Sequence, residues 1–135
     1  MLSKKTQYGL KALGYLASRY GEGPVLIADI SHEKNIPIKF LENILLHLKK
    51  HGVLESKEKG VAITYQKPPA KTTIAAAIRM LEGPIALLPC VSLNFYRKCD
   101  DCNESSCGLN KVMAATRDAT LKVLDKKTLR DLADQ

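Results

Sequence analysis

The sequence lacks the marks of a membrane protein and of the common enzyme classes. No run approaches the ~18 consecutive apolar residues of a transmembrane helix, and the N-terminus has no apolar segment typical of a secretion signal. There is also no internal repeat, low-complexity tract or Gly-rich nucleotide-binding loop, and no catalytic dyad or triad emerges. We therefore expect a soluble, cytoplasmic domain that is not an enzyme.

Positive charge is concentrated in the first part of the chain. Residues 1–98 contain 15 Lys and Arg residues against 7 Asp and Glu residues, whereas residues 99–135 contain 6 against 7. The front of the chain therefore carries a net charge of +8 and the back −1, which together give the net charge of +7. An excess confined to one region favours a polyanionic partner such as nucleic acid.

The front of the chain predicts three helices and a hairpin. Apolar residues recur at helical spacing over residues 3–20, 27–34 and 38–51, and the third helix should bury Phe40, Leu41, Ile44, Leu45 and Leu48. Residues 53–56 and 61–65 predict two strands joined by a charged turn. This order is typical of a winged helix-turn-helix, whose second helix can enter a DNA major groove. For the helix pair alone, a plain helical-bundle corner is the alternative.

The back of the chain predicts a dimer. A helix over residues 74–82 precedes a polar loop, and a long helix over residues 109–124 carries an apolar stripe that so small a core cannot cover. A second copy of the chain is the natural cover, because symmetric DNA readers work as homodimers. A short helix is expected over residues 129–133. The predicted dimerisation residues are Leu109, Val112, Met113, Thr116, Thr120 and Val123.

The predicted fold is thus mainly α with a small β-hairpin wing. It comprises a winged helix-turn-helix DNA-binding domain at residues 1–82, a cysteine-rich loop at 83–108, and a dimerisation helix with a C-terminal helix at 109–135.

All four cysteines lie in the predicted loop, as Cys90, Cys99, Cys102 and Cys107. The segment is too polar to bury four thiols separately, so the thiols are expected to share one partner. Zinc and an iron-sulfur cluster both suit soft thiolates, and bare thiols acting as a redox switch are a third possibility. A pair of disulfides would need an oxidising compartment, which nothing in the sequence indicates.

Five segments carry a resemblance to a known family. They are LSKKTQYGLKAL at 2–13, IPIKFLENIL at 36–45, KPP at 67–69, LEGPI at 81–85 and CGL at 107–109. With these the chain resembles, nearly end to end, the Rrf2 family of bacterial winged-helix transcription regulators of the IscR and NsrR type. The resemblance implies an iron-sulfur cluster in the cysteine loop, [2Fe-2S] or [4Fe-4S], with zinc as the alternative cofactor. An iron-sulfur carrier or electron-transfer module is the rival function, although a winged helix does not suit it.

The resemblance also implies which residues contact DNA. A homodimer would bind a double-stranded operator and act as a repressor, with Lys39, Glu42 and Asn43 facing base edges. Phosphates would be contacted by Lys4, Lys5, Tyr8, Lys49 and Lys57. The chain departs from the family in two places: the wing lacks the usual Arg-Gly and Gly-Gly-Tyr residues, and the loop has a fourth cysteine where relatives supply a His or a carboxylate.

Overall fold

The computed structural model describes residues 2–100 and 103–133. The first helix, α1 (Lys4–Ser18), starts where the Ser3 hydroxyl accepts a hydrogen bond from the Thr6 backbone N–H at 3.3 Å. Helix α2 (Ile27–Lys34) ends at Asn35, which adopts the left-handed conformation (φ 52°) that closes helices. Pro37 then leads into α3 (Ile38–Lys50). These three helices match the ranges that the apolar spacing predicts.

A three-stranded antiparallel sheet accompanies the three helices. Strands β2 (Leu54–Lys57) and β3 (Ala62–Tyr65) form the predicted hairpin, joined by the short 3-10 helix η1 (Glu58–Gly60). The sequence did not predict the third strand, β1 (Val25–Leu26), which lies ahead of α2 and pairs with β3 in the order β1-β3-β2. This pairing fixes the wing to the body of the helix-turn-helix.

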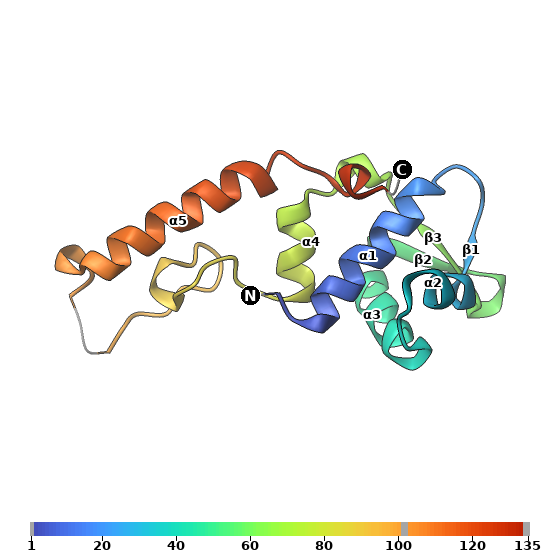
Figure 1. Ribbon diagram of the computed structural model, residues 1–135, viewed down its shortest axis with the longest axis horizontal. Helices are drawn as coiled ribbons and strands as arrows, with labels where there is room; N and C mark the ends of the chain where they lie inside the picture. The colour runs from blue at the N-terminus through green and yellow to red at the C-terminus, as the bar shows by residue number, and fades with distance from the viewer. Residues whose placement is uncertain (1, 101–102, 134–135) are drawn as a thin grey trace.

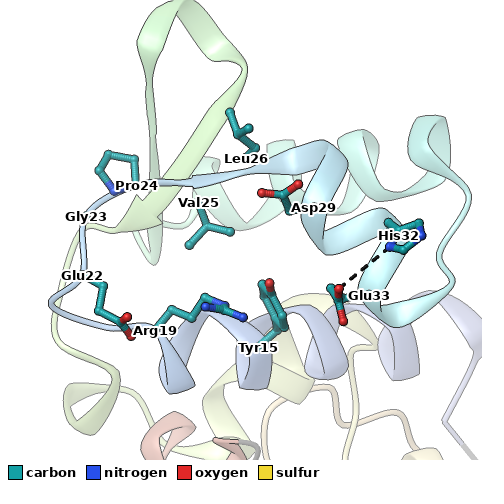
Figure 2. Close-up of a pocket in the computed structure, with 10 residues that line it drawn as sticks. All are labelled: Tyr15, Arg19, Glu22, Gly23, Pro24, Val25, Leu26, Asp29, His32 and Glu33. Carbon is teal, nitrogen blue, oxygen red and sulfur yellow. Dashed lines mark ion pairs between the residues drawn. The ribbon is translucent and has the colours of Figure 1, made fainter.

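The return of the chain from α1 to β1 leaves an open pocket of about 570 Å³, shown in Figure 2. Two contacts join residues that line it. The Arg19 guanidinium stacks over the Tyr15 ring, 4.8 Å from the ring centroid, and His32 lies 3.8 Å from the Glu33 carboxylate. None of the residues expected to bind DNA or metal lines this pocket.

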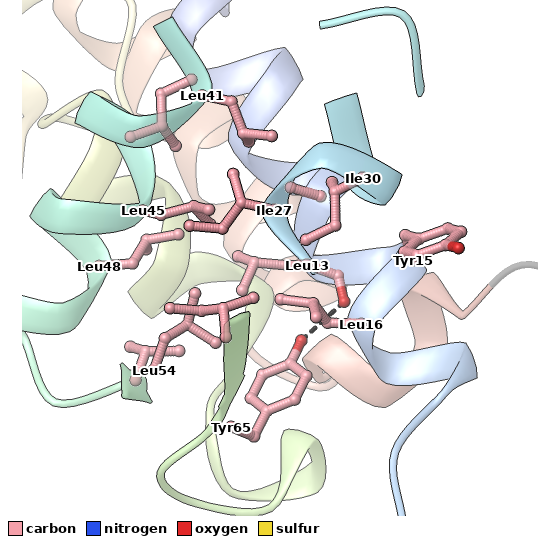
Figure 3. Close-up of a cluster of buried hydrophobic side chains, with 14 of the residues drawn as sticks. Leu13, Tyr15, Leu16, Ile27, Ile30, Leu41, Leu45, Leu48, Leu54 and Tyr65 are labelled. Atoms are coloured by element: carbon pink, nitrogen blue, oxygen red, sulfur yellow. Dashed lines mark hydrogen bonds between the residues drawn. The ribbon is translucent and has the colours of Figure 1, made fainter. Parts of the chain in front are cut away.

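The core lies where α1, α2, α3 and the sheet meet, as Figure 3 shows. Leu13, Ile30, Leu41 and Leu48 are fully buried in it. Tyr65 joins the sheet to α1, because its hydroxyl donates a 2.7 Å hydrogen bond to the Leu13 carbonyl oxygen. Burial raises the pKa of this phenol. The core therefore fixes the orientation of α3 relative to the wing.

The loop after α4 (Ile74–Leu81) and the long helix α5 (Gly108–Leu124) extend away from this body (Figure 1). Helix α4 packs on α1 and α3, and the loop after it contains two 3-10 helices, η3 (Pro89–Val91) and η4 (Glu104–Ser106). The long helix α5 lies beside this loop. The chain then returns to the body, where the last element, the 3-10 helix η5 (Leu129–Leu132), packs on α1. The predicted C-terminal helix is thus a single 3-10 turn, and Leu129 within it is fully buried.

One predicted core residue is exposed. Phe40 keeps 41% of its surface accessible, and its ring meets the Tyr8 ring edge-on with 5.6 Å between centroids. The expectation that Phe40 is buried was therefore wrong. Its position in α3 places it beside the packed stripe, at the seam between α1 and α3.

Candidate nucleic-acid interface and cysteine loop

Helix α3 buries one face and presents a polar face to solvent. Leu41, Ile44, Leu45 and Leu48 are at most 1% exposed. On the opposite side Lys39, Glu42 and Asn43 are all exposed, at the N-terminal half of the helix. In a helix-turn-helix this half of the second helix contacts base edges. The three residues expected to read bases therefore share the surface that such a reading requires.

The start of α1 adds positive charge near an aromatic pair. Lys4 is exposed, with its ammonium nitrogen 5.5 Å from the centroid of the Tyr8 ring, and Lys5 is half-buried. Tyr8 in turn meets Phe40 of α3. This contact places the lysines of α1 and the start of α3 on neighbouring parts of the surface, where both can face one duplex.

The two basic residues expected near the wing already have polar partners. The Lys49 ammonium group donates to the Ser56 hydroxyl at 2.7 Å, and Lys57 lies 3.4 Å from the Glu55 carboxylate. Both the hydrogen bond and the ion pair are at the surface, where such contacts stabilise little, so each lysine can exchange its partner for a phosphate. The turn between β2 and β3 has a left-handed backbone conformation, because Glu58, Lys59 and Gly60 all have positive φ angles.

Two of the cysteine sulfurs accept hydrogen bonds from the same residue, Asn110. Cys107 caps α5, and its sulfur accepts the Asn110 backbone N–H at 3.4 Å. The side-chain amide of Asn110 also donates to the Cys90 sulfur at 3.4 Å. Cys90, Cys99 and Cys107 are half-buried free thiols, and Cys102 lies outside the described residues.

The donor chemistry of this loop fits a thiophilic metal centre, although its geometry is only partly assembled. Within residues 2–100 and 103–133, no three His, Cys, Asp or Glu side chains are grouped closely enough to hold a metal ion. Beside the cysteines, the Tyr96 hydroxyl donates to a Glu104 carboxylate oxygen at 2.6 Å, and this bond raises the pKa of Tyr96. The four-cysteine site therefore stays a prediction, and two of its members have Asn110 as a common hydrogen-bond partner.

The loop is tied to the body and to α5 by two residues that the sequence did not single out. Glu82 accepts a 2.6 Å hydrogen bond from the Ser3 backbone N–H, which holds the pKa of the Glu82 carboxyl below its usual range. Arg117 of α5 donates to the Val91 carbonyl oxygen at 2.7 Å and also pairs with Asp118. Glu82 lies in the segment 81–85, which carries the family resemblance, whereas Arg117 lies in none of the five segments. The sequence therefore marked the position of Glu82 but did not indicate its contact with Ser3.

The predicted dimerisation stripe is largely uncovered in the single chain. Leu109, Val112 and Val123 are 57–58% exposed, and Met113 is half-buried. Thr116 and Thr120 are exposed, and their hydroxyls donate to carbonyl oxygens one turn back in α5. An apolar groove of about 340 Å³ lies beside this helix, between α5 and the residues that follow α4.

Comparison with known proteins places this architecture in a family. The family model described as "Rrf2: Iron-dependent Transcriptional regulator" matches residues 2–135. This chain belongs to the Rrf2 family. It is 37% identical over 98% of its length to an "rrf2-like" HTH-type transcriptional regulator of Rhodobacter capsulatus, of which the match covers 91%. An HTH-type transcriptional regulator NsrR of Bacillus licheniformis is 31% identical over 97% of the chain and 90% of the relative.

Among solved structures, CymR, described as the global cysteine regulator of B. subtilis, superposes with a TM-score of 0.80 at 30% identity, covering 98% of this chain and 95% of that one. T. potens IscR gives a TM-score of 0.75 at 26% identity, covering 98% of this chain and 85% of that one.

Membership of the Rrf2 family confirms the winged-helix fold and the role as a DNA-binding transcription regulator. It also confirms that the protein is not an enzyme. None of the helices that the structure describes is long and apolar enough to cross a membrane.

Proposed function

We propose that this Rrf2 protein binds operator DNA as a homodimer and represses transcription, and that an iron-sulfur cluster in residues 83–108 controls its affinity for DNA. Residues 1–82 form the DNA-binding domain, and residues 109–135 supply the dimerisation helix. Because an operator lies in the cytoplasm of a bacterium, the protein acts there. The observation that carries the proposal is the exposed polar face of α3 beside a wing, with a cysteine loop attached to the same body.

In this proposal three residues of α3 read the bases of the DNA, and other residues position the protein on the duplex. Glu42 can accept a hydrogen bond from a cytosine amino group, and Asn43 can both donate to and accept from adenine. Lys39 beside them can donate to guanine. Lys4, Lys5, Tyr8, Lys49 and Lys57 contact phosphates, which orients the protein without reading sequence. These assignments agree with the exposure of Lys4, Lys39, Glu42, Asn43 and Lys57.

The cluster would be held by Cys90, Cys99, Cys102 and Cys107. An iron-sulfur cluster supplies a group whose charge and survival depend on oxidation and on iron supply. Asn110 donates hydrogen bonds toward two of the sulfurs, and such bonds stabilise thiolate charge. The description of the family as iron-dependent and the presence of IscR and NsrR among the similar proteins support this choice over zinc.

A hydrogen bond made by Glu82 connects the cysteine loop to the proposed DNA-binding surface of the protein. This residue ends α4 immediately before the loop, and its carboxylate accepts the N–H of Ser3, the residue that caps α1. Lys4 and Lys5 follow directly. A rearrangement of the loop that moves Glu82 would therefore release the start of α1, and with it the phosphate-binding lysines.

The cysteine loop is also connected to α5, the proposed dimerisation helix. Arg117 donates to the Val91 carbonyl oxygen, and Asn110 donates to the Cys90 sulfur, so two hydrogen bonds join α5 to the loop. The uncovered stripe of α5 would pack on a second copy, and a change in the loop would alter the spacing of the two α3 helices. The distance between the two α3 helices determines whether the dimer binds its operator, because the two helices must reach half-sites about one helical turn apart.

The DNA-reading part of the proposal is tested by selecting duplexes from a randomised pool and measuring the Glu42→Ala variant on the selected and on random sequences. The variant should lose roughly 1–3 kcal/mol of discrimination at one base pair per half-site, while its affinity for random duplexes holds or rises. Glu22→Ala, an exposed glutamate in the loop after α1, is the matched control. Equal weakening on both duplexes would show that Glu42 does not read bases.

A thiol switch is the second candidate, and one observation favours it. The sulfurs of Cys90 and Cys107 both accept hydrogen bonds from Asn110, whereas the described residues supply no three-ligand metal group. In that case the protein purified without oxygen would carry neither iron nor zinc, and a mild oxidant would change its affinity for DNA.

A further inference from the structure

The exposed face of α3 contains two aliphatic side chains that the assigned DNA contacts leave without a role. Ile38 is the first residue of α3 and is 44% exposed, and Leu46, two turns later, is 46% exposed. Both line a groove of about 510 Å³ between α3, the start of α2 and the tip of the wing, which Glu42 and Asn43 also line. Leu26 and Val61, which are 43% and 57% exposed, line the same groove, and an exposed apolar patch of this kind marks a binding surface.

The position of the groove identifies what covers it. Glu42 and Asn43, which are expected to face base edges, and Lys49, which is expected to contact a phosphate, all line it. A duplex docked on α3 would therefore enclose the groove. The occupant is therefore the major groove of DNA.

The major groove offers one apolar group to such a side chain, the C5-methyl group of thymine. Ile38 is better placed than Leu46 to meet it, because the N-terminal residues of a recognition helix make the base contacts. Pro37 fixes the backbone directly ahead of it, and a β-branched side chain has few rotamers. Ile38 thus presents its methyl groups in a nearly fixed orientation, which favours discrimination between bases.

We infer that Ile38 is a specificity-determining residue that reads a thymine methyl group in each operator half-site. This inference rests on the proposed function, since it needs α3 to lie in the major groove. Ile38 and Glu42 lie one turn apart on the same face, about 6 Å along the helix axis, so the thymine should lie within about two base pairs of the base pair that Glu42 contacts.

Replacing thymine by deoxyuridine tests the inference, because it removes the methyl group and leaves the hydrogen-bonding edge unchanged. The probe is a duplex selected by the wild-type protein from a randomised pool, with each thymine replaced in turn. One position per half-site should weaken wild-type binding by about fourfold, the effect of one buried methyl group, and by about 15-fold when both half-sites are changed.

The variants assign the effect to a residue. With Ile38→Ala the sensitive position should lose its sensitivity, and Ile38→Val should retain part of it. Leu46→Ala, which truncates an equally exposed neighbour in the same groove, should keep the full fourfold effect. If Ile38→Ala failed to fold, the comparison of wild type with Ile38→Val on the substituted duplexes would still decide the assignment.

Three results separate failure of this inference from failure of the proposed function. If no uracil substitution weakens wild-type binding, or if Ile38→Ala retains the sensitivity, Ile38 does not read thymine and the DNA-binding proposal stands. If Leu46→Ala abolishes the sensitivity instead, Leu46 contacts the thymine methyl group in place of Ile38, and the inference fails. If the pool yields no preferred duplex at all, sequence-specific operator binding itself is rejected.

Discussion

The contact between Glu82 and Ser3 joins the cysteine loop to the DNA-binding surface, and replacing Glu82 by Gln tests what it contributes. The carboxylate accepts the Ser3 backbone N–H at 2.6 Å, at the N-terminus of α1, where a negative charge is favourable. Gln keeps an acceptor oxygen and removes the charge. Because Glu82 is only partly buried, solvent weakens the effect, and we expect a loss of about 0.5–1 kcal/mol in the free energy of unfolding at pH 7.

The pH dependence of this loss follows from the lowered pKa of Glu82. A carboxyl whose pKa is lower in the folded state contributes its full stability above the pKa of the unfolded chain, about 4.3 for Glu. That contribution is lost as the pH falls through the folded-state pKa. The difference between wild type and Glu82→Gln should therefore be present at pH 7 and vanish in acid.

Urea denaturation at pH 7 and in acid, at one protein concentration, measures this difference. Glu22→Gln removes an exposed carboxylate outside the contact and serves as the control. A Glu82→Gln variant as stable as wild type at pH 7, or one whose deficit persists unchanged in acid, would refute the coupling. The same variant should also weaken operator binding, because Lys4 and Lys5 follow Ser3 directly.

Two further predictions concern dimerisation and phosphate binding. Replacing Val112 and Thr116 of α5 by Asp should give monomers in sedimentation experiments, and an intact dimer would exclude the stripe as the interface. Lys49→Ala and Lys57→Ala should each weaken binding to all duplexes alike and flatten the salt dependence of the affinity, by about one unit of log–log slope for each phosphate that the lysine neutralises in the wild type. An unchanged slope would mean that the lysine keeps its partner in the wing and does not contact DNA.

Helical spacing in the sequence was sufficient to predict the body of the fold. The ranges of α1, α2 and α3 follow from apolar periodicity and from the breaks at Gly21, Pro37 and Gly52. Strand β1 was missed because two residues after Gly23 and Pro24 carry no periodic signal, and its pairing with β3 is a tertiary event. Phe40 was misplaced because periodicity gives a direction around a helix and says nothing of how wide the packed face is.

The residues of the candidate site could be predicted from the sequence, but the contacts that connect them to the rest of the fold could not. The clustering of cysteines and the polar face of α3 are visible in the sequence, and the structure places Cys90 and Cys107 at one asparagine. Glu82 and Ser3, however, are 79 residues apart in the chain, and Arg117 bonds a backbone carbonyl 26 residues away. Such contacts depend on how elements pack, which a single sequence does not encode in any local pattern.

The central claim is that the cysteine loop holds an iron-sulfur cluster that sets the affinity for DNA. The most direct measurement uses protein purified without oxygen: iron, acid-labile sulfide and zinc are determined on one sample, and its affinity for a selected duplex is measured before and after the cluster is removed. We expect a coloured protein with iron and sulfide bound, and an affinity that changes by roughly tenfold or more on removal. A colourless protein with one zinc ion per chain, or an affinity that does not change, would contradict the account.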